Sequence, residues 1–472
     1  MTGEHGFSVE VSQNKYLSIE DEEMDAVLVV TAGGAAAEDG VPELAEVITI
    51  DCSGSMYYPP TKLAAAQRAT RTAIDVLRDG THFAVVQGNE RARMVYPETP
   101  ELVVVTPETR LAAKSAVAEV RANGATAIGE WLRLARQLLD ARPAAVRHVT
   151  LLTDGRNNQG MDVLEHELRA CAPVFTCDSR GIGEDWEPRE LLRIAEALHG
   201  SADAARELNA LADEFEAMVQ AAMDKLFPEV RITVSTTSLA EVDFLRQTFP
   251  TESQLEGDAD GPRGIAFATG SWGAEQREFH LRLRVDPADA ELDQDIRLAR
   301  VDLRLRRPGA TEFENPCAPA LVLGHWTQDL TLSSIIDPKV AHHTKQTELG
   351  KAIMRGCDAH DRSDTAAATA EWGHAVALAT RLGNDKVLTR LLRLVEVVGE
   401  PADGVVRIKQ DVRAVDLLSA AMGSVVSSMS PDAAPASAPT PAVLDPEVSC
   451  PTCHKNWPAG SDFCGACGER LR

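Results

Sequence analysis

Hydrophobic and polar residues alternate with a period of two in two stretches of the chain, and this period is typical of β-strands. Phe7, Val9 and Val11 alternate with polar neighbours, and an apolar run follows over residues 26–31. The alternation returns after residue 228 in three runs: Val230, Ile232 and Val234; Phe279, Leu281, Leu283 and Val285; Val301, Leu303 and Leu305. The pattern predicts antiparallel strands over residues 1–45 and 228–335, as in a β-sandwich.

These two strand regions can combine in two ways. Residues 1–45 alone are too few to bury a core. We therefore predict one β-sandwich made from residues 1–45 and 228–335, with the intervening segment inserted between them. Two independent β units are the alternative.

Residues 46–227 show a different order, in which short apolar strands alternate with amphipathic helices. Such alternation predicts an α/β fold with a doubly wound parallel sheet. The expected strands are residues 47–50, 83–86, 102–105, 148–153 and 173–176. The expected helices are residues 62–77, 110–121, 130–139, 164–171, 188–198 and 204–226.

The last part of the chain divides into three segments by composition. Residues 336–425 have helical periodicity and predict a small bundle, with helices at 347–360, 364–382 and 384–398. His342 and His343 are adjacent rather than at metal-ligand spacing, so we expect them at the surface. Residues 426–449 are rich in Pro, Ala and Ser and predict a disordered linker to residues 450–472.

Composition narrows the partners and the compartment. The formal net charge is −25, from 72 acidic and 47 basic residues. This acidity disfavours a general nucleic-acid or anionic-membrane surface, since both need Lys and Arg to neutralise phosphates. The sequence has no apolar run of membrane-spanning length and no visible signal peptide. The nine cysteines are an odd number, which favours a reducing compartment, so we expect a cytoplasmic protein.

The predicted strand at 47–50 leads directly into Asp51-Cys52-Ser53-Gly54-Ser55. This loop offers one carboxylate and two hydroxyls. Oxygen donors of this kind, completed by water, suit Mg²⁺ or Mn²⁺. Ser and Asp are also common turn and capping residues, so the motif alone leaves a structural cap and a metal loop equally open.

Two later segments favour the metal loop. Residues 123–129 form a Gly-flanked turn that carries Thr126 and leads into a helix. A second apolar strand, residues 148–153, ends in Asp154-Gly155. We expect both segments at the carboxyl edge of the parallel sheet, where open α/β sheets bind their ligands.

In order, spacing and context, these three motifs resemble the metal-ion-dependent adhesion site of the von Willebrand factor type A (VWA) family over residues 45–224. The resemblance implies a Rossmann-like sheet, with Ser53 and Ser55 binding the metal directly. It also implies that Asp51 and Asp154 act largely through water, and that Thr126 acts directly or through water. An open coordination position would be filled by the Asp or Glu of a partner protein. Several proteins of this family also carry the domain within a β-sandwich.

A second metal site is predicted from Cys450-x₂-Cys453 and Cys464-x₂-Cys467. Four thiolates at this spacing select tetrahedral Zn²⁺. The segment resembles a zinc ribbon, and four cysteines close the coordination shell, which indicates a structural site. Its basic residues are few, so a tethered protein-contact module is favoured over nucleic-acid binding.

The sequence therefore predicts a non-enzymatic scaffold that captures a partner's carboxylate through Mg²⁺, with the zinc ribbon as a second contact. The loops look closest to bacterial intracellular VWA proteins, which work beside AAA+ ATPases, stress-response proteins or signalling enzymes. A nucleic-acid-associated factor led by the ribbon is the alternative. A Mg²⁺-dependent phosphoester hydrolase is disfavoured because the chain has neither a P-loop motif nor a visible base–nucleophile pair.

Overall fold

The computed structural model describes residues 6–33, 42–143, 145–288, 290–429, 448–449 and 456–457. The chain divides into two compact units, residues 1–429 and 430–472. In the second unit, only the paired strands β22 (Val448–Ser449) and β23 (Asn456–Trp457) are described. The predicted zinc ligands Cys450, Cys453, Cys464 and Cys467 lie outside the described residues, as does most of the predicted linker.

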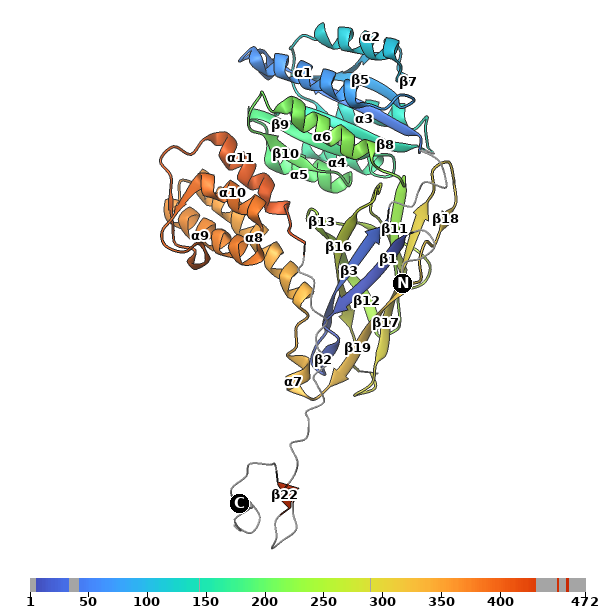
Figure 1. Ribbon diagram of the computed structural model, residues 1–472, viewed down its shortest axis with the longest axis vertical. Helices are drawn as coiled ribbons and strands as arrows, with labels where there is room; N and C mark the ends of the chain where they lie inside the picture. The colour runs from blue at the N-terminus through green and yellow to red at the C-terminus, as the bar shows by residue number, and fades with distance from the viewer. Residues whose placement is uncertain are drawn as a thin grey trace. The chain divides into compact units, whose positions relative to one another are not determined.

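A mostly parallel sheet forms the centre of the segment that carries the metal-type motifs (Figure 1). Its strands lie in the order β10-β9-β8-β4-β5-β6, and β7 also pairs with β5. Strands β4, β5, β8, β9 and β10 are parallel, whereas β6 and β7 run antiparallel to β5. The bounds are β4 (Leu44–Asp51), β5 (His82–Gly88), β6 (Ala92–Tyr96), β7 (Val103–Val104), β8 (Val146–Gly155), β9 (Thr176–Asp185) and β10 (Ala202–Ala205).

Helices cover both faces of this sheet, because successive side chains of a buried strand point to opposite faces. In β4, Ile48 and Ile50 join the core beneath α1, α2 and α6, whereas Ala45 and Val47 join the core beneath α3, α4 and α5. The helices are α1 (Thr61–Val76), α2 (Pro107–Ala118), α3 (Ile128–Leu139), α4 (Met161–Cys171), α5 (Pro188–Ala197) and α6 (Leu211–Met223). The predicted α/β arrangement with a parallel sheet and helices is confirmed.

Two predicted elements of this region are wrong. The strand expected at 173–176 begins only at Thr176 and continues to Asp185. The long helix expected over 204–226 is two elements, β10 and α6. Alanine favours helices, but Ala202–Ala205 lies beside the open edge of β9 and pairs with it, so tertiary pairing overrides local propensity.

The strands before and after this α/β segment hydrogen-bond to one another in two sheets (Figure 1). The first sheet has the order β1-β3-β16-β12-β13, and the second has the order β14-β15-β11-β17-β19-β2, with β18 paired to β17. The bounds are β1 (Phe7–Gln13), β2 (Tyr16–Ser18), β3 (Glu23–Ala32), β11 (Glu229–Thr236), β12 (Ala240–Phe249), β13 (Ser253–Gln254), β14 (Gly257–Ala259), β15 (Gly264–Ala268), β16 (Gln276–Val285), β17 (Ile296–Arg306), β18 (Phe313–Glu314) and β19 (Ala320–Thr327).

The inward-facing residues of both sheets form one hydrophobic core, and we call this part the two-sheet unit. Strand β3 precedes the α/β segment and pairs with β16, which follows it; Val30 lies opposite Arg277 and Leu28 opposite Phe279. The chain therefore leaves the two-sheet unit, forms the α/β segment and returns. One pair departs from the expected antiparallel pattern, because β2 is parallel to β19.

The helical region covers exposed parts of both neighbours. Its elements are α7 (Leu330–Ser333), α8 (Pro338–Asp361), α9 (Thr365–Leu382), α10 (Asp385–Leu394), β20 (Val395–Val397), β21 (Val406–Ile408) and α11 (Ala414–Met422). Asp416 on α11 accepts hydrogen bonds from Arg206, just after edge strand β10. Helix α8 packs against β3 through Val340. None of the helices described is long and apolar enough to cross a membrane.

The surface position expected for His342 and His343 is wrong. Both are buried, because α8 lies on the first sheet. His343 Nε2 is 2.7 Å from a Glu278 carboxylate oxygen, and both side chains are fully buried. His342 Nε2 is 3.1 Å from the carbonyl oxygen of Ser428. Residues 426–428 therefore contact the helical region, although we predicted them as the start of a linker.

Candidate metal centre

The first loop of the candidate centre is fixed by the carboxylate of Asp51 at the end of the fully buried strand β4. Asp51 Oδ1 accepts a hydrogen bond of 2.7 Å from the backbone N–H of Ser53. This bond turns the chain into the 3₁₀ helix Gly54–Tyr57, which places Ser55 above the end of the sheet. Asp51 Oδ2 accepts from Thr153 Oγ1 at 2.7 Å and from the Asp154 N–H at 3.2 Å. Asp51 therefore ties its own loop to the Asp154 loop.

The oxygen donors of the first and third loops lie in direct contact. Ser53 Oγ is 2.9 Å from Ser55 Oγ, and the Ser55 hydroxyl donates to Asp154 Oδ1 at 2.6 Å. Asp51 and Asp154 are both fully buried. Burial and the nearby charge of Asp154 together raise the pKa of Asp51 to about 6. A bound cation would relieve the repulsion between these two carboxylates.

The second loop is held against the other two by backbone and amide hydrogen bonds. The Gly54 N–H donates to the Gly124 carbonyl at 2.8 Å. The Thr126 N–H donates to Asn158 Oδ1 at 2.8 Å. A Cβ placed on Gly155 would lie 2.9 Å from Thr126 Oγ1 and 3.3 Å from Ser55 Oγ. The structure thus brings Thr126 beside Ser55 and Gly155, and only glycine leaves that space open.

A cavity of about 410 Å³ opens above these donors. Its lining comes from all three loops and from the end of β9: Ser53, Gly54, Ser55, Gly124, Ala125, Thr126, Gly155, Arg156, Asn158, Glu184 and Asp185. Serine and threonine hydroxyls with two carboxylates form a donor set that fits Mg²⁺ or Mn²⁺. The described ranges, this centre included, contain no group of three or more His, Cys, Asp or Glu side chains that could hold a metal ion, so the site depends on hydroxyl donors as well as on carboxylates.

Comparison with known proteins agrees with this geometry. Residues 45–204 match the family model described as von Willebrand factor type A domain. The chain is 37% identical to a von Willebrand factor type A protein from Catenulispora acidiphila, with a TM-score of 0.82 over 90% of this chain and 97% of that one. The chain belongs to the von Willebrand factor type A family.

A second solved structure has the same fold as this VWA protein, and the similarity covers most of both chains. The ArnB paralog VWA2 from Sulfolobus acidocaldarius is 13% identical, with a TM-score of 0.51 over 90% of this chain and 100% of that one. No curated protein matches the chain.

Lys62 is a residue of the VWA centre that the sequence analysis missed. Its ammonium donates to Asp154 Oδ2 at 2.9 Å and lies 3.3 Å from Asp185 Oδ2. Burial alone would lower the pKa of Lys62, but its contacts with Asp154 and Asp185 outweigh burial and raise it. Lys62 is the second residue of α1, the helix that follows the first loop, and a long side chain at that position can reach back to the site.

Two asparagines after Asp154 were also missed as parts of the centre. Asn157 Oδ1 accepts from the Ile128 N–H at 3.2 Å and so caps the amino end of α3 from another loop. Asn158 binds Thr126 twice, because its own N–H also donates to the Thr126 carbonyl at 2.8 Å. The motif Asp-Gly-x-Asn-Asn contains turn-forming residues, but that pattern does not indicate that the asparagines bind the loop of Thr126 and Ile128.

Cys52 lies in the first loop but does not contribute a metal donor of the kind found in Ser53 and Ser55. Its side chain is 1% exposed. Burial and the neighbouring charges of Asp51 and Glu90 raise the pKa of its thiol to about 12. The thiol therefore stays protonated at neutral pH, and a thiolate ligand is disfavoured.

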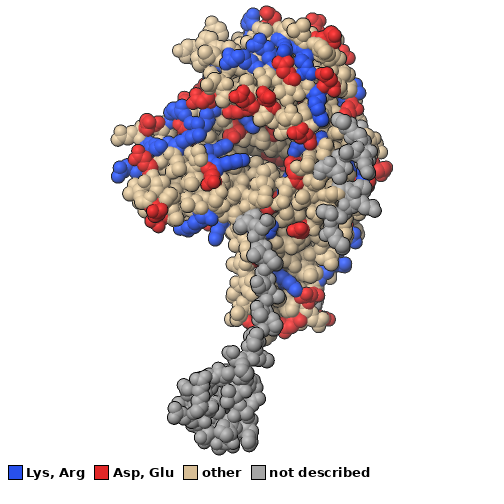
Figure 2. Space-filling view, viewed as in Figure 1, with Lys and Arg blue, Asp and Glu red and all other residues tan. Residues whose placement is uncertain are grey.

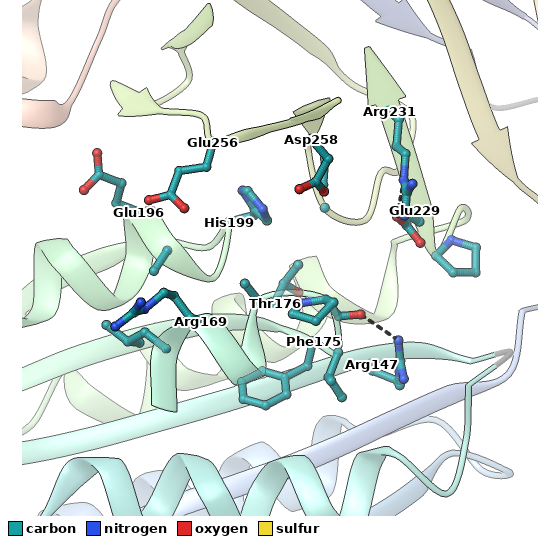
Figure 3. Close-up of a pocket in the computed structure, with 18 of the residues that line it drawn as sticks. Arg147, Arg169, Phe175, Thr176, Glu196, His199, Glu229, Arg231, Glu256 and Asp258 are labelled. Carbon is teal, nitrogen blue, oxygen red and sulfur yellow. Dashed lines mark hydrogen bonds and ion pairs between the residues drawn. The ribbon is translucent and has the colours of Figure 1, made fainter. Parts of the chain in front are cut away.

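A second cavity, of about 350 Å³, lies between the VWA domain and the two-sheet unit (Figure 3). His199 lies between Glu256 and Asp258 on one side and Thr176 and Phe175 on the other. Burial and the charge of Arg277 lower the pKa of His199 to about 4. The charged lining is largely paired internally, as in the Glu229 pairs with Arg231 and Arg306 and the Arg193 pair with Glu196. Serine and threonine hydroxyls do not cluster with carboxylates here as they do above β4.

Proposed function

We propose that this VWA protein is a non-enzymatic scaffold that captures an Asp or Glu side chain of a partner protein through a divalent cation, Mg²⁺ or Mn²⁺. Asp51, Ser53, Ser55, Thr126 and Asp154 would hold the cation. One observation carries the proposal: the Ser55 hydroxyl contacts both Ser53 and Asp154 beneath a cavity that opens to solvent. Bound there, the cation would supply an electrophilic position for an anionic oxygen.

The balance of charge supports binding of a carboxylate rather than full neutralisation of the metal. Lys62 already neutralises Asp154 at 2.9 Å. The hydroxyls of Ser53, Ser55 and Thr126 carry no charge. A dication at this site therefore keeps part of its positive charge, which attracts an external carboxylate.

The surroundings favour binding over hydrolysis. A hydrolase needs a base or nucleophile free to reach the substrate. In the described part of the chain, the titratable side chains buried beneath the cavity are Asp51, Asp154 and Lys62, and all three are held in mutual or backbone hydrogen bonds. On the face shown in Figure 2, acidic side chains lie among the basic ones, a pattern that does not favour a nucleic-acid backbone as the partner.

The test is the effect of Mg²⁺ on thermal unfolding. A ligand that binds only the native state raises the melting temperature. We expect Mg²⁺ to raise the melting temperature of the wild-type protein, and Asp51→Ala with Asp154→Ala to abolish this rise. The matched control is Asp75→Ala with Asp79→Ala, which removes two carboxylates from exposed positions of the same domain. An equal rise in the Asp51/Asp154 variant would place the metal elsewhere.

We further propose that residues 450–472 form a zinc ribbon, and that this ribbon adds a second protein contact in the cytoplasm. The four cysteines at two Cys-x₂-Cys spacings support Zn²⁺. Metal analysis of the purified chain should find one zinc per chain, and Cys450→Ser with Cys464→Ser should remove it. Retention of zinc in that variant would assign the metal to another part of the molecule.

A further inference from the structure

Two tyrosines follow the first metal loop and lie open to solvent. The side chains of Tyr57 and Tyr58 are 73% and 79% exposed. The chain has four tyrosines, and the other two, Tyr16 and Tyr96, are partly buried. Large aromatic side chains are enriched at the contact surfaces of protein complexes, because they bury much area at a low cost in conformational entropy. Only Met56 separates the tyrosines from Ser55, which lines the cavity of the metal centre.

Two carboxylates at the end of β9 also border this cavity. Glu184 and Asp185 both line the cavity and are exposed. Within the described residues, the Glu184 carboxylate has no ion pair. Asp185 reaches Lys62 at 3.3 Å, yet its side chain stays 69% exposed. Both carboxylates are therefore available to a positively charged group of a partner.

Lys62 joins the tyrosine segment to the acidic end of β9. Its backbone N–H donates to the Pro59 carbonyl at 2.9 Å, directly after Tyr58. Its side chain runs over Gly183, where a Cβ would lie 2.9 Å from Lys62 Cε, and ends at Asp185. Lys62 thus links the two segments beside the metal cavity. We call Tyr57, Tyr58, Glu184 and Asp185 the rim.

The charges around the cavity indicate what the rim would accept. Asp51, Asp154, Glu184 and Asp185 supply four negative charges, against one each from Lys62 and Arg156. A divalent cation balances this excess, and the partner's carboxylate then makes the site negative again. A positive charge beside the partner's carboxylate is therefore favoured. The faces of exposed tyrosines also attract cations, and arginine most strongly because it is planar and weakly hydrated.

We propose that the rim selects a partner segment in which the metal-binding Asp or Glu is followed by a basic residue, arginine in preference to lysine. The basic group lies between the rim carboxylates and the tyrosine faces. This inference rests on the proposed function, since the carboxylate must reach the metal. It adds the chemistry by which the site distinguishes one acidic segment from another.

The test uses the full chain with Mg²⁺ and three immobilised peptides. The peptides are Gly-Gly-Asp-Arg-Gly-Gly, Gly-Gly-Asp-Glu-Gly-Gly and Gly-Gly-Asn-Arg-Gly-Gly, and binding is measured by biolayer interferometry with and without EDTA. We expect the Asp-Arg peptide to bind about three- to tenfold more tightly than the Asp-Glu peptide. The Asn-Arg peptide should not bind, and EDTA should release the Asp-Arg peptide.

Variants of the rim then distinguish the preference for the Asp-Arg peptide from the binding of a carboxylate to the metal. Glu184→Gln and the double variant Tyr57→Ala with Tyr58→Ala should each reduce the preference for Asp-Arg. Glu216→Gln, an exposed glutamate on α6, is the matched control and should keep the preference. The Mg²⁺-dependent rise in melting temperature should persist in Glu184→Gln, which shows that the variant is folded and binds metal.

Each failure has its own meaning. Equal Mg²⁺-dependent binding of the two Asp peptides would overturn the selective rim and leave carboxylate capture standing. An unchanged preference in both rim variants would place selection on another surface. Binding that needs neither Asp nor Mg²⁺, or no binding of any peptide, would overturn carboxylate capture together with the rim.

Discussion

The two ends of the VWA sheet both hold buried carboxylates, but the groups that surround them differ. At the amino end, His148 Nδ1 lies 2.8 Å from a Glu46 carboxylate oxygen and His148 Nε2 lies 3.1 Å from an Asp178 carboxylate oxygen, so one internal cation contacts both carboxylates. At the carboxyl end, Lys62 contacts Asp154 but not Asp51, and both carboxylates lie beneath a cavity of about 410 Å³. Among the described residues, each cluster has two carboxylates and one internal cation, so the two differ in contacts and access rather than in net charge: the amino-end carboxylates both contact His148, whereas Asp51 has no cation partner and lies beneath an open cavity that can accept a metal ion.

The largest expected effect is the loss of stability on removal of His148. His148→Ala leaves Glu46, which is fully buried, without its partner. Loss of one member of a buried ion pair costs ~3–5 kcal/mol, and urea unfolding should show a decrease of this size in the free energy of unfolding. The matched control is His374→Ala, whose pair with Glu348 is exposed and should contribute less than ~1 kcal/mol. Equal effects of the two variants would refute the structural role of the amino-end cluster.

The pH dependence of stability tests the same cluster in the wild-type protein. Burial alone would lower the pKa of His148, but Glu46 and Asp178 outweigh burial and raise it to about 10. A raised pKa of this kind contributes stability that is complete below the unfolded value of about 6.5. This contribution is lost as the pH rises through the folded value. We expect the free energy of unfolding to decrease by on the order of 3 kcal/mol between pH 6.5 and 9.5.

The control for this pH dependence is the His148→Ala variant. It lacks the titrating imidazole, so its free energy of unfolding should change much less over the same pH range. Parallel pH profiles of the variant and the wild-type protein, measured by urea unfolding, would contradict the assignment to His148.

The smallest expected effect is a change in Mg²⁺ affinity at the metal centre. Lys62→Met removes the internal cation from Asp154 and makes the carboxyl end more negative. We expect Mg²⁺ to bind about tenfold more tightly, a change of ~1.4 kcal/mol. Titration of Mg²⁺ followed by melting temperature measures the change. Lys114→Met, which removes a lysine paired with Asp75 at the surface, should leave Mg²⁺ affinity unchanged. Weaker binding in Lys62→Met would mean that Lys62 orders the site rather than limits its charge.

The α/β segment could be predicted from the sequence because its signals are local. Strands β4, β5 and β8 contain short apolar runs, as in residues 47–50, and the Asp51 and Asp154 motifs lie directly after such runs. Ala202–Ala205 misled the prediction because its strand forms only through pairing with β9. His342 and His343 did so because α8 is buried by a sheet that is distant in the sequence.

The candidate site was only partly visible in the sequence for a related reason. Carboxylates and hydroxyls at the ends of predicted strands indicate a metal site by their residue type and position, as Asp51, Ser53 and Asp154 do. Lys62 and Asn158 are ordinary helix and turn residues, and their roles depend on contacts that join different loops. No local pattern encodes those contacts.

By itself, the sequence determined the VWA family, the alternation of strands and helices and the oxygen-donor loops, because hydrophobic period and residue chemistry act over a few neighbouring positions. Only the tertiary structure decided that β3 pairs with β16, that Lys62 reaches Asp154, and that one cluster of buried carboxylates is closed while the other faces a cavity. These outcomes depend on which surfaces pack together across long separations in the chain, and packing fixes both burial and the distances between charges.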